Sequence, residues 1–115
     1  MSKKKLVVEL GMGVDLHGKN YTKAAVRAVE NAVRGGSLLY LGEIYKETGK
    51  FPKVYVDVII GVPEPELVDK DEVLKSLPIG EKTIKVVPGG LSIDHTQPDN
   101  IVIANASVLV QVETE

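Results

Sequence analysis

One segment of the chain combines residue types that can orient and transfer a proton. It contains Gly11, Gly13, Asp15, His17 and Gly18, and it follows a β-rich run. Glycine lets the backbone come close to a ligand, and an aspartate can fix the tautomer of a nearby histidine. The segment is therefore a candidate for acid–base catalysis. The structural alternative is that its glycines only shape a tight turn and its polar side chains are solvated.

A second segment repeats this combination later in the chain. Gly89 and Gly90 follow an apolar run, and Asp94 and His95 come a few residues downstream. The chain has two histidines, and each lies just after an aspartate and a pair of glycines. We predict that these four residues contribute to ligand binding, with turn formation as the alternative. The spacing leaves open whether the two segments meet.

Thr22 and Lys23 stand at the start of a predicted helix, just after the first segment. Backbone N–H groups at a helix N-terminus favour carboxylate or phosphate, and Lys23 adds positive charge. We therefore expect a site for a small polar or anionic metabolite, in which Asp15, His17 and Lys23 have catalytic roles. The residues expected to bind the ligand are Gly11, Gly13, Gly18, Thr22, Gly89, Gly90, Asp94, His95 and Asn105.

Other kinds of site fit the sequence less well. A dinucleotide fingerprint needs a third glycine at position 16, where this chain has Leu16, and no P-loop pattern occurs. Asp15, His17, Asp94 and His95 could together ligate zinc, manganese or iron, but they follow no recognised ligand spacing. We therefore predict no metal site, and the identity of any cofactor stays open.

Length and composition limit the class of protein. The 115 residues suffice for one domain, which we place at 1–115, and the net charge of −2 argues against nucleic-acid binding. The absence of cysteine excludes disulfides and thiolate chemistry. No apolar run approaches the ~18 residues of a membrane helix. Lys3, Lys4 and Lys5 lack a following signal-peptide core, so we expect a solvated tail on a cytoplasmic protein that does not bind membranes.

The hydrophobic periodicity predicts an α+β domain with the element order β-α-(α)-β-α-β-β. A helix capped by Asn20 or Thr22 runs to about Arg34, and a helix capped by Asp69 follows later. A short helix is expected over 37–48. The four predicted strands cover 5–10, 53–62, 82–87 and 101–112. We expect a mixed four-stranded sheet with the helices packed on one face, the first two strands parallel and the last two antiparallel.

The last strand carries the most packing information. Alternate residues from Val102 to Val112 are all apolar and include two alanines, which predicts close contact with the alanine-rich face of the first helix. The opposite face mixes apolar and polar residues, and a sheet face of this kind suggests subunit contact. We place Glu9, Tyr55, Asp57 and Asn105 on that mixed face as further candidates to line a site between subunits.

Several segments in order also make the chain resemble the Lin-type family of short hypothetical bacterial and archaeal proteins. They are 11–18, 22–29, 61–63, 77–80, 87–90 and 103–106. The resemblance implies no settled activity, and it marks Asp15, His17, Thr22 and Lys23 as a signature. The expected architecture is similar to chorismate-mutase-like and YjgF-like folds, which assemble as trimers around their exposed sheets. The ring-opening amidohydrolases look like three such units fused, and that analogy would make Ser92 and Lys23 the pair to test.

The sequence thus predicts a homo-oligomer that binds a small metabolite at a subunit interface. This site could support hydrolysis or isomerisation by acid–base chemistry. The alternative is a non-catalytic oligomeric scaffold or regulatory binding module, in which the glycine-rich segments serve only the fold.

Overall fold

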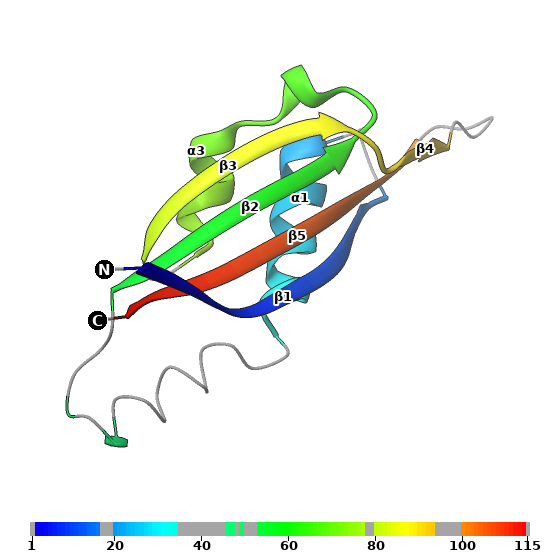
Figure 1. Cartoon of the computed structure of the whole chain (residues 1–115). Helices are drawn as coiled ribbons and strands as arrows, with labels where there is room; N and C mark the ends of the chain where they lie inside the picture. Colours follow the sequence, from blue (N-terminus) through cyan, green and yellow to red (C-terminus); the bar gives the residue numbers. More distant parts are fainter. Residues whose placement is uncertain are drawn as a thin grey trace.

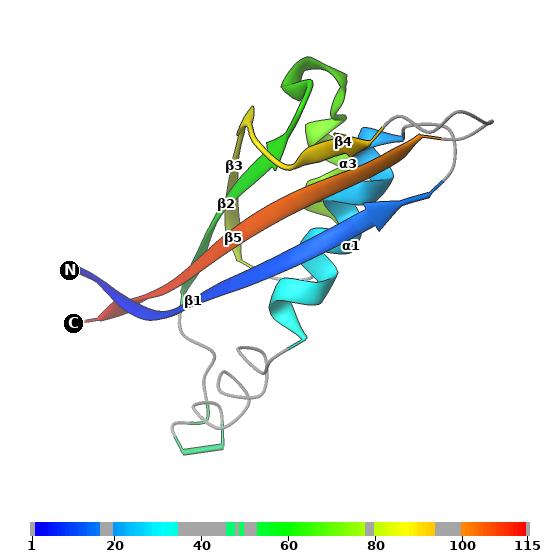
Figure 2. The ribbon, with the colours of Figure 1, turned by 90° about the vertical axis from the view of Figure 1, so that its right-hand side faces the viewer.

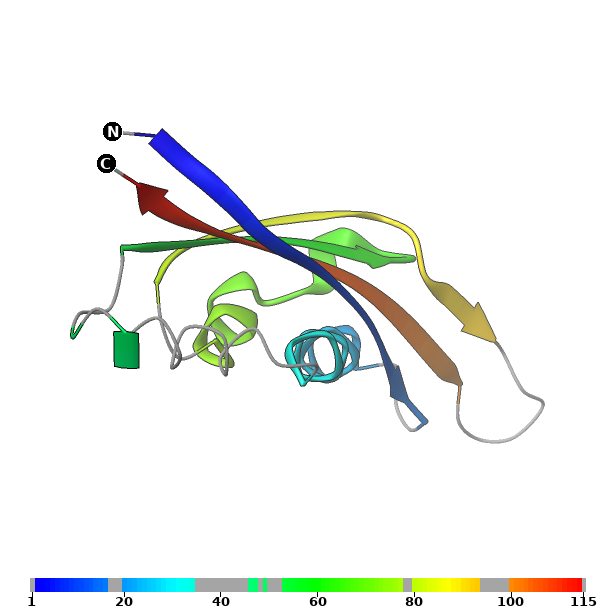
Figure 3. The same cartoon turned by 60° about the horizontal axis from the view of Figure 1, so that its bottom comes forward.

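The structure is a computed structural model that describes residues 2–16, 20–34, 46–47, 49, 53–77, 80–93 and 100–114. Its helices lie against one face of a five-stranded sheet (Figures 1 and 3). The helical elements are α1 (Tyr21–Val33), the 3-10 turn η1 (Pro65–Leu67) and α3 (Lys70–Lys75). The strands are β1 (Ser2–Asp15), β2 (Val54–Val62), β3 (Glu81–Pro88), β4 (Leu91–Ile93) and β5 (Ile101–Thr114). The predicted α+β class with helices on one sheet face is confirmed.

The last strand of the chain lies in the middle of the sheet. The strand order is β1-β5-β2-β3, and the short β4 pairs with β5 beyond the end of β2. Both β1 and β2 are antiparallel to β5, so they run in the same direction with β5 between them. β3 is parallel to β2 and therefore opposite in direction to β5. The predicted strand directions are confirmed, but the fifth strand, β4, was not predicted.

Most element boundaries agree with the periodicity, and the first strand is the exception. β1 reaches Asp15 instead of ending at residue 10, because it pairs with β5 along its whole length. Asn20 is the N-cap of α1, and its side-chain oxygen accepts from the Lys23 amide at 2.9 Å. Asp69 caps α3 as predicted, accepting from the Glu72 amide at 3.2 Å. The predicted helix over 37–48 lies outside the described residues except at 46–47.

The core lies between the sheet and the two helices. Alternate residues of β2 and β5 point into it and are buried, as the pattern predicts. From α1, the core receives small side chains, including Ala24, Ala28 and Ala32, so the helix can approach the sheet closely. α3 contributes Val73, and Leu77 follows it.

The long central strands give the molecule an elongated shape of 56 × 22 × 18 Å (Figure 2). β1 and β5 stay paired to the far end of the sheet, where Ser2 pairs with Thr114 (Figure 3). β2 accompanies β5 almost as far, since Val54 pairs with Val112. Within the described ranges, no helix is both long and apolar enough to cross a membrane.

Candidate functional site

Gly11 and Gly13 lie inside β1, facing α1, and not in a loop. A Cβ atom on Gly11 would overlap the Ala28 carbonyl oxygen and the Ala32 backbone. A Cβ atom on Gly13 would overlap the Ala24 carbonyl oxygen and the Ala28 amide nitrogen. The two glycines therefore let the helix lie directly on the strand, and this packing accounts for both without a ligand.

The close approach brings two polar side chains of α1 to the free edge of β1. Asn31 accepts a hydrogen bond from the Met12 amide at 3.1 Å. Arg27 donates to the Val14 carbonyl oxygen at 2.6 Å. These contacts use backbone groups that an edge strand otherwise offers to another chain. Sequence reasoning missed both residues, although their four-residue spacing places them on one side of the helix.

Asp15 is buried at the end of β1, with 3% of its side chain exposed. Its carboxylate accepts from the Asn20 amide at 2.9 Å and pairs with the Arg27 guanidinium at 3.7 Å. Asp15 thus joins the end of β1 to the start of α1, and its cationic partner is Arg27. His17 and Gly18, which were expected beside it, lie outside the described residues.

Thr22 and Lys23 are both at the N-terminus of α1, as predicted. The Thr22 hydroxyl oxygen accepts from the Asp69 amide at 2.8 Å, which connects α1 to the start of α3. The neighbouring Tyr21 donates to Glu64 at 2.7 Å, so a second contact joins the same two regions. The Lys23 side chain is exposed. The described contacts therefore give Thr22 a structural role and leave Lys23 accessible to solvent.

Gly89 and Gly90 form the crossover from β3 to β4. The Gly89 amide donates to the Val62 carbonyl oxygen at 3.0 Å, and Gly89 would carry a Cβ atom only 3.1 Å from Gly61 Cα. Gly90 has φ +62°, and a Cβ atom there would overlap the Ile103 carbonyl oxygen. The glycines let the chain cross the end of β2 and pair with β5. Asp94 and His95 lie outside the described residues, so their distance from Asp15 and His17 is untested.

The sheet face opposite the helices carries a group of exposed apolar side chains, which we call the apolar stripe. Leu10 is 76% exposed and Met12 53% exposed. The other members are somewhat less exposed, and they too lie at strand positions that face away from the core. The apolar stripe consists of Val8, Leu10, Met12, Ile59 and Leu91. Such a group on one surface is typical of a contact with another molecule.

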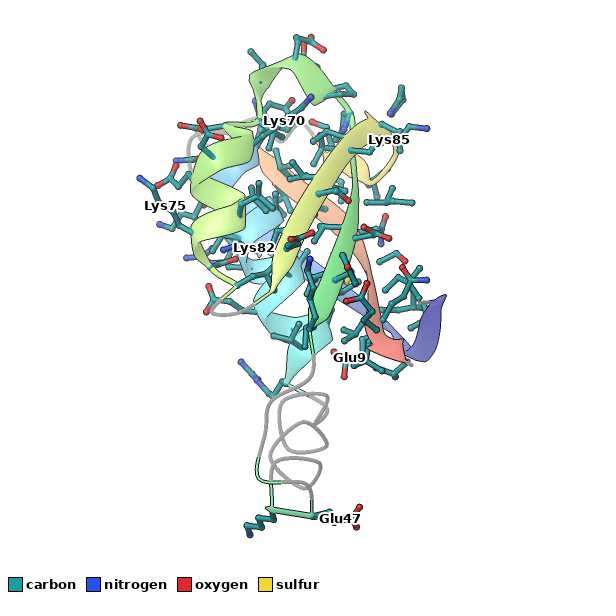
Figure 4. All side chains as sticks on the ribbon, turned by 60° about the vertical axis from the view of Figure 1, so that its left-hand side comes forward. Glu9, Glu47, Lys70, Lys75, Lys82 and Lys85 are labelled. Atoms are coloured by element: carbon teal, nitrogen blue, oxygen red, sulfur yellow. The ribbon has the colours of Figure 1, made fainter. Side chains whose placement is uncertain are left out.

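Polar candidates on this face divide between its middle and its rim. Asn105 is exposed, and its cross-strand neighbours are Met12 and Gly61. Tyr55 and Asp57 lie on the same face, nearer to β3. Glu9 does not, because it pairs with buried Val108 and so points to the helix side (Figure 4). The prediction that Glu9 lies on the mixed face is wrong. In this part of β1, the odd-numbered residues face the helices and the even-numbered ones face away from them.

The rim next to β3 is hydrogen-bonded and charged. Thr83 donates to Asp57 at 2.7 Å, and Tyr55 donates to Glu113 at 3.1 Å. Lys53 pairs with Glu81 at 3.3 Å. The hydrogen bond from Lys53 to Glu81, followed by the charge of Glu81, raises the pKa of Lys53 above its usual value. The rim is thus polar, while the part of the face over β1 and β5 is mostly apolar.

No group of three or more acidic or histidine side chains in the described ranges could hold a metal ion. Asp15, Thr22 and Lys23 share one end of α1, whereas Gly89, Gly90 and Asn105 lie around the crossover to β4. The sequence-predicted residues therefore fall into two groups, and among the described residues no side-chain hydrogen bond or ion pair joins one group to the other.

These features define a two-layer α+β domain with one sheet face covered by helices. The other face is open, with its apolar side chains mostly over β1 and its charged ones along β3. The sequence over residues 5–110 matches the family of conserved hypothetical proteins called Lin0512, and the chain belongs to that family. The resemblance stated from the motifs is thereby confirmed.

A solved structure of similar fold comes from Nostoc punctiforme and is described as an FtsZ-like protein of unknown function. It is 36% identical to this chain, and the alignment covers 99% of each chain with a TM-score of 0.82. No curated protein matched the sequence.

Proposed function

We propose that this protein is a homo-oligomer whose subunits join through the apolar stripe and which acts as a non-catalytic scaffold or regulatory binding module. The exposure of Leu10, on a strand whose opposite face packs against a helix, carries this proposal. Burying one such side chain contributes roughly 1.5–3 kcal/mol, so the stripe could stabilise a subunit contact by several kilocalories per mole. A cytoplasmic location is part of the proposal.

The contacts of Asp15 favour this scaffold over an acid–base enzyme. A general base needs a free lone pair within reach of its substrate. The Asp15 carboxylate is buried, accepts from a backbone amide and faces a guanidinium, so its contacts serve the link between β1 and α1. The glycines of the two segments that the structure describes, Gly11, Gly13, Gly89 and Gly90, are likewise explained by close packing.

The experiment compares the mass of the wild-type protein in solution with that of Leu10→Asp. We expect the wild type to be oligomeric. In the variant, the dissociation constant of the oligomer should rise about a hundredfold or more, because a charge would be buried at the contact. Leu67→Asp is the matched control, since Leu67 is 54% exposed in η1, outside the sheet. A monomeric wild type, or equal weakening by both variants, would refute the proposal.

A second candidate function is binding of a small polar or anionic metabolite at the same interface. Asn105 favours it, because this exposed amide stands among apolar neighbours and makes no hydrogen bond within the described ranges. Assembly through this face would bury the amide, which then needs a polar partner. We expect inorganic phosphate or malonate to raise the melting temperature of the wild type but not of Asn105→Ala. Equal shifts in both proteins would count against an interfacial site.

A further inference from the structure

We propose that the second copy docks face to face on the sheet, with Leu10 of each copy placed over Ser107 of the other. This inference rests on the proposed function and specifies how the subunits meet. The molecule bound on the open face is a second copy of this chain, and the pattern of large and small side chains across three strands determines its position.

The strand edges are poor places for a second copy to add. At β1, Asn31 and Arg27 already bind the Met12 amide and the Val14 carbonyl oxygen. At the other edge, β3 carries exposed Glu81 and Lys85 and ends at a proline. Covering groups, charges and proline are the features by which natural sheets prevent edge-to-edge pairing. Because these features disfavour the edges of β1 and β3, we place the self-association on the open face.

One cross-strand row of the open face contains a small residue between two large ones. Ser107 of β5 pairs with Leu10 on β1 and with Ile59 on β2. Leu10 is 76% exposed and Ile59 46% exposed, whereas Ser107 is half-buried between them. A two-fold axis brings equivalent surfaces together, so a protruding residue of one copy must meet a small residue of the other. Leu10 over Ser107 satisfies this condition twice in one dimer.

The face is large enough for such a contact. β1 and β5 have 14 residues each, and β2 has 9. At about 3.3 Å per residue and about 4.8 Å per strand, the flat footprint is about 590 Å² before side-chain relief is added, against about 800 Å² per partner in a standard interface. Lys85 of β3 pairs with Ile59 of β2 and belongs to the charged rim of this face (Figure 4). Protein interfaces typically have such a polar rim around an apolar centre.

The test replaces Ser107 by a larger apolar residue. If Leu10 of the partner lies over Ser107, then Ser107→Phe weakens the dimer by about tenfold or more, although it makes the face more apolar. Ser107→Ala stays within about threefold of the wild type. Thr83→Phe, on the polar rim of the same face, controls for added bulk. Tighter or unchanged association of Ser107→Phe would overturn the inference.

A cross-linking experiment keeps the inference testable if Ser107→Phe fails to fold. The chain has no cysteine, so single-cysteine variants are free of background. An oxidised mixture of Leu10→Cys and size-tagged Ser107→Cys should give a higher yield of mixed disulfide dimer than an oxidised mixture of Leu10→Cys and size-tagged Thr83→Cys. Equal yields would exclude the placement. A monomeric wild type refutes the proposed function itself, whereas a dimer that tolerates Ser107→Phe and gives equal yields refutes only this arrangement.

Discussion

At the scale of single residues, Asp15 shows how a side chain that suits catalysis can be bound into the fold. It follows the strand predicted from the sequence, it is close to a histidine in the chain, and its type fits a base or an orienting group. In the structure, its carboxylate accepts from the backbone amide of the α1 N-cap and pairs with a guanidinium from the second turn of that helix. These partners become visible only when the fold places Arg27 beside the end of β1.

We expect Asp15→Ala to lower the free energy of unfolding by about 1–3 kcal/mol, because it removes a buried acceptor and leaves the Asn20 amide without its partner. Urea unfolding measures the difference. Glu30→Ala is the control, since Glu30 is exposed on the same helix. If Asp15→Ala keeps full stability and instead abolishes a ligand-dependent shift in melting temperature, the residue belongs to a binding site and our structural interpretation fails.

At the scale of elements, the contact between β1 and α1 explains why the glycine pattern misled the prediction. Glycine after a short apolar run indicated a loop, so the first strand was predicted to end at residue 10. The strand continues because β5 pairs with it, and long-range pairing has no local signature in the sequence. Local signals did suffice where the chemistry is local, as in the Asp69 cap of α3 and the alternation of β2.

We expect Gly13→Ala to destabilise the protein by about 1–3 kcal/mol or more, because the added methyl group overlaps backbone atoms of α1 that cannot move alone. Thermal melting and urea unfolding measure the loss. Gly61→Ala is the matched control within another strand, since its Cβ atom would meet Gly89 at an ordinary 3.4 Å. Equal stability of the two variants would contradict the account of the Gly11 and Gly13 contact.

At the scale of the whole molecule, the two sheet faces have different compositions. On β2 and β5, the face toward the helices is apolar, and this was predictable from the alternation of both strands. The open face was predictable as mixed, but not which of its residues are exposed, because this depends on the strand order around β5. His17, Asp94 and His95 lie outside the described residues, so their predicted roles stay predictions.

An apolar subunit contact predicts a specific response to salt. Exposed charge pairs are screened as ionic strength rises, whereas apolar burial is not weakened. We therefore expect the dissociation constant of the oligomer to stay within about twofold, or to decrease, between about 0.05 and about 0.5 M sodium chloride. Sedimentation at several salt concentrations measures it. A steep increase would locate the contact on the charged rim around Lys53 and Glu81 instead.

The position of β5 also sets the order in which the molecule can be completed during synthesis. β1 and β2 do not pair with each other, and each meets its central neighbour only after residues 101–114 have been made. Leu10 and Ser107, for example, are neighbours in the sheet although about a hundred residues separate them in the chain. On the ribosome, β1 therefore has no strand partner, and β2 can pair only with β3, until the final strand emerges. The apolar faces of these earlier strands stay available to chaperones during that time.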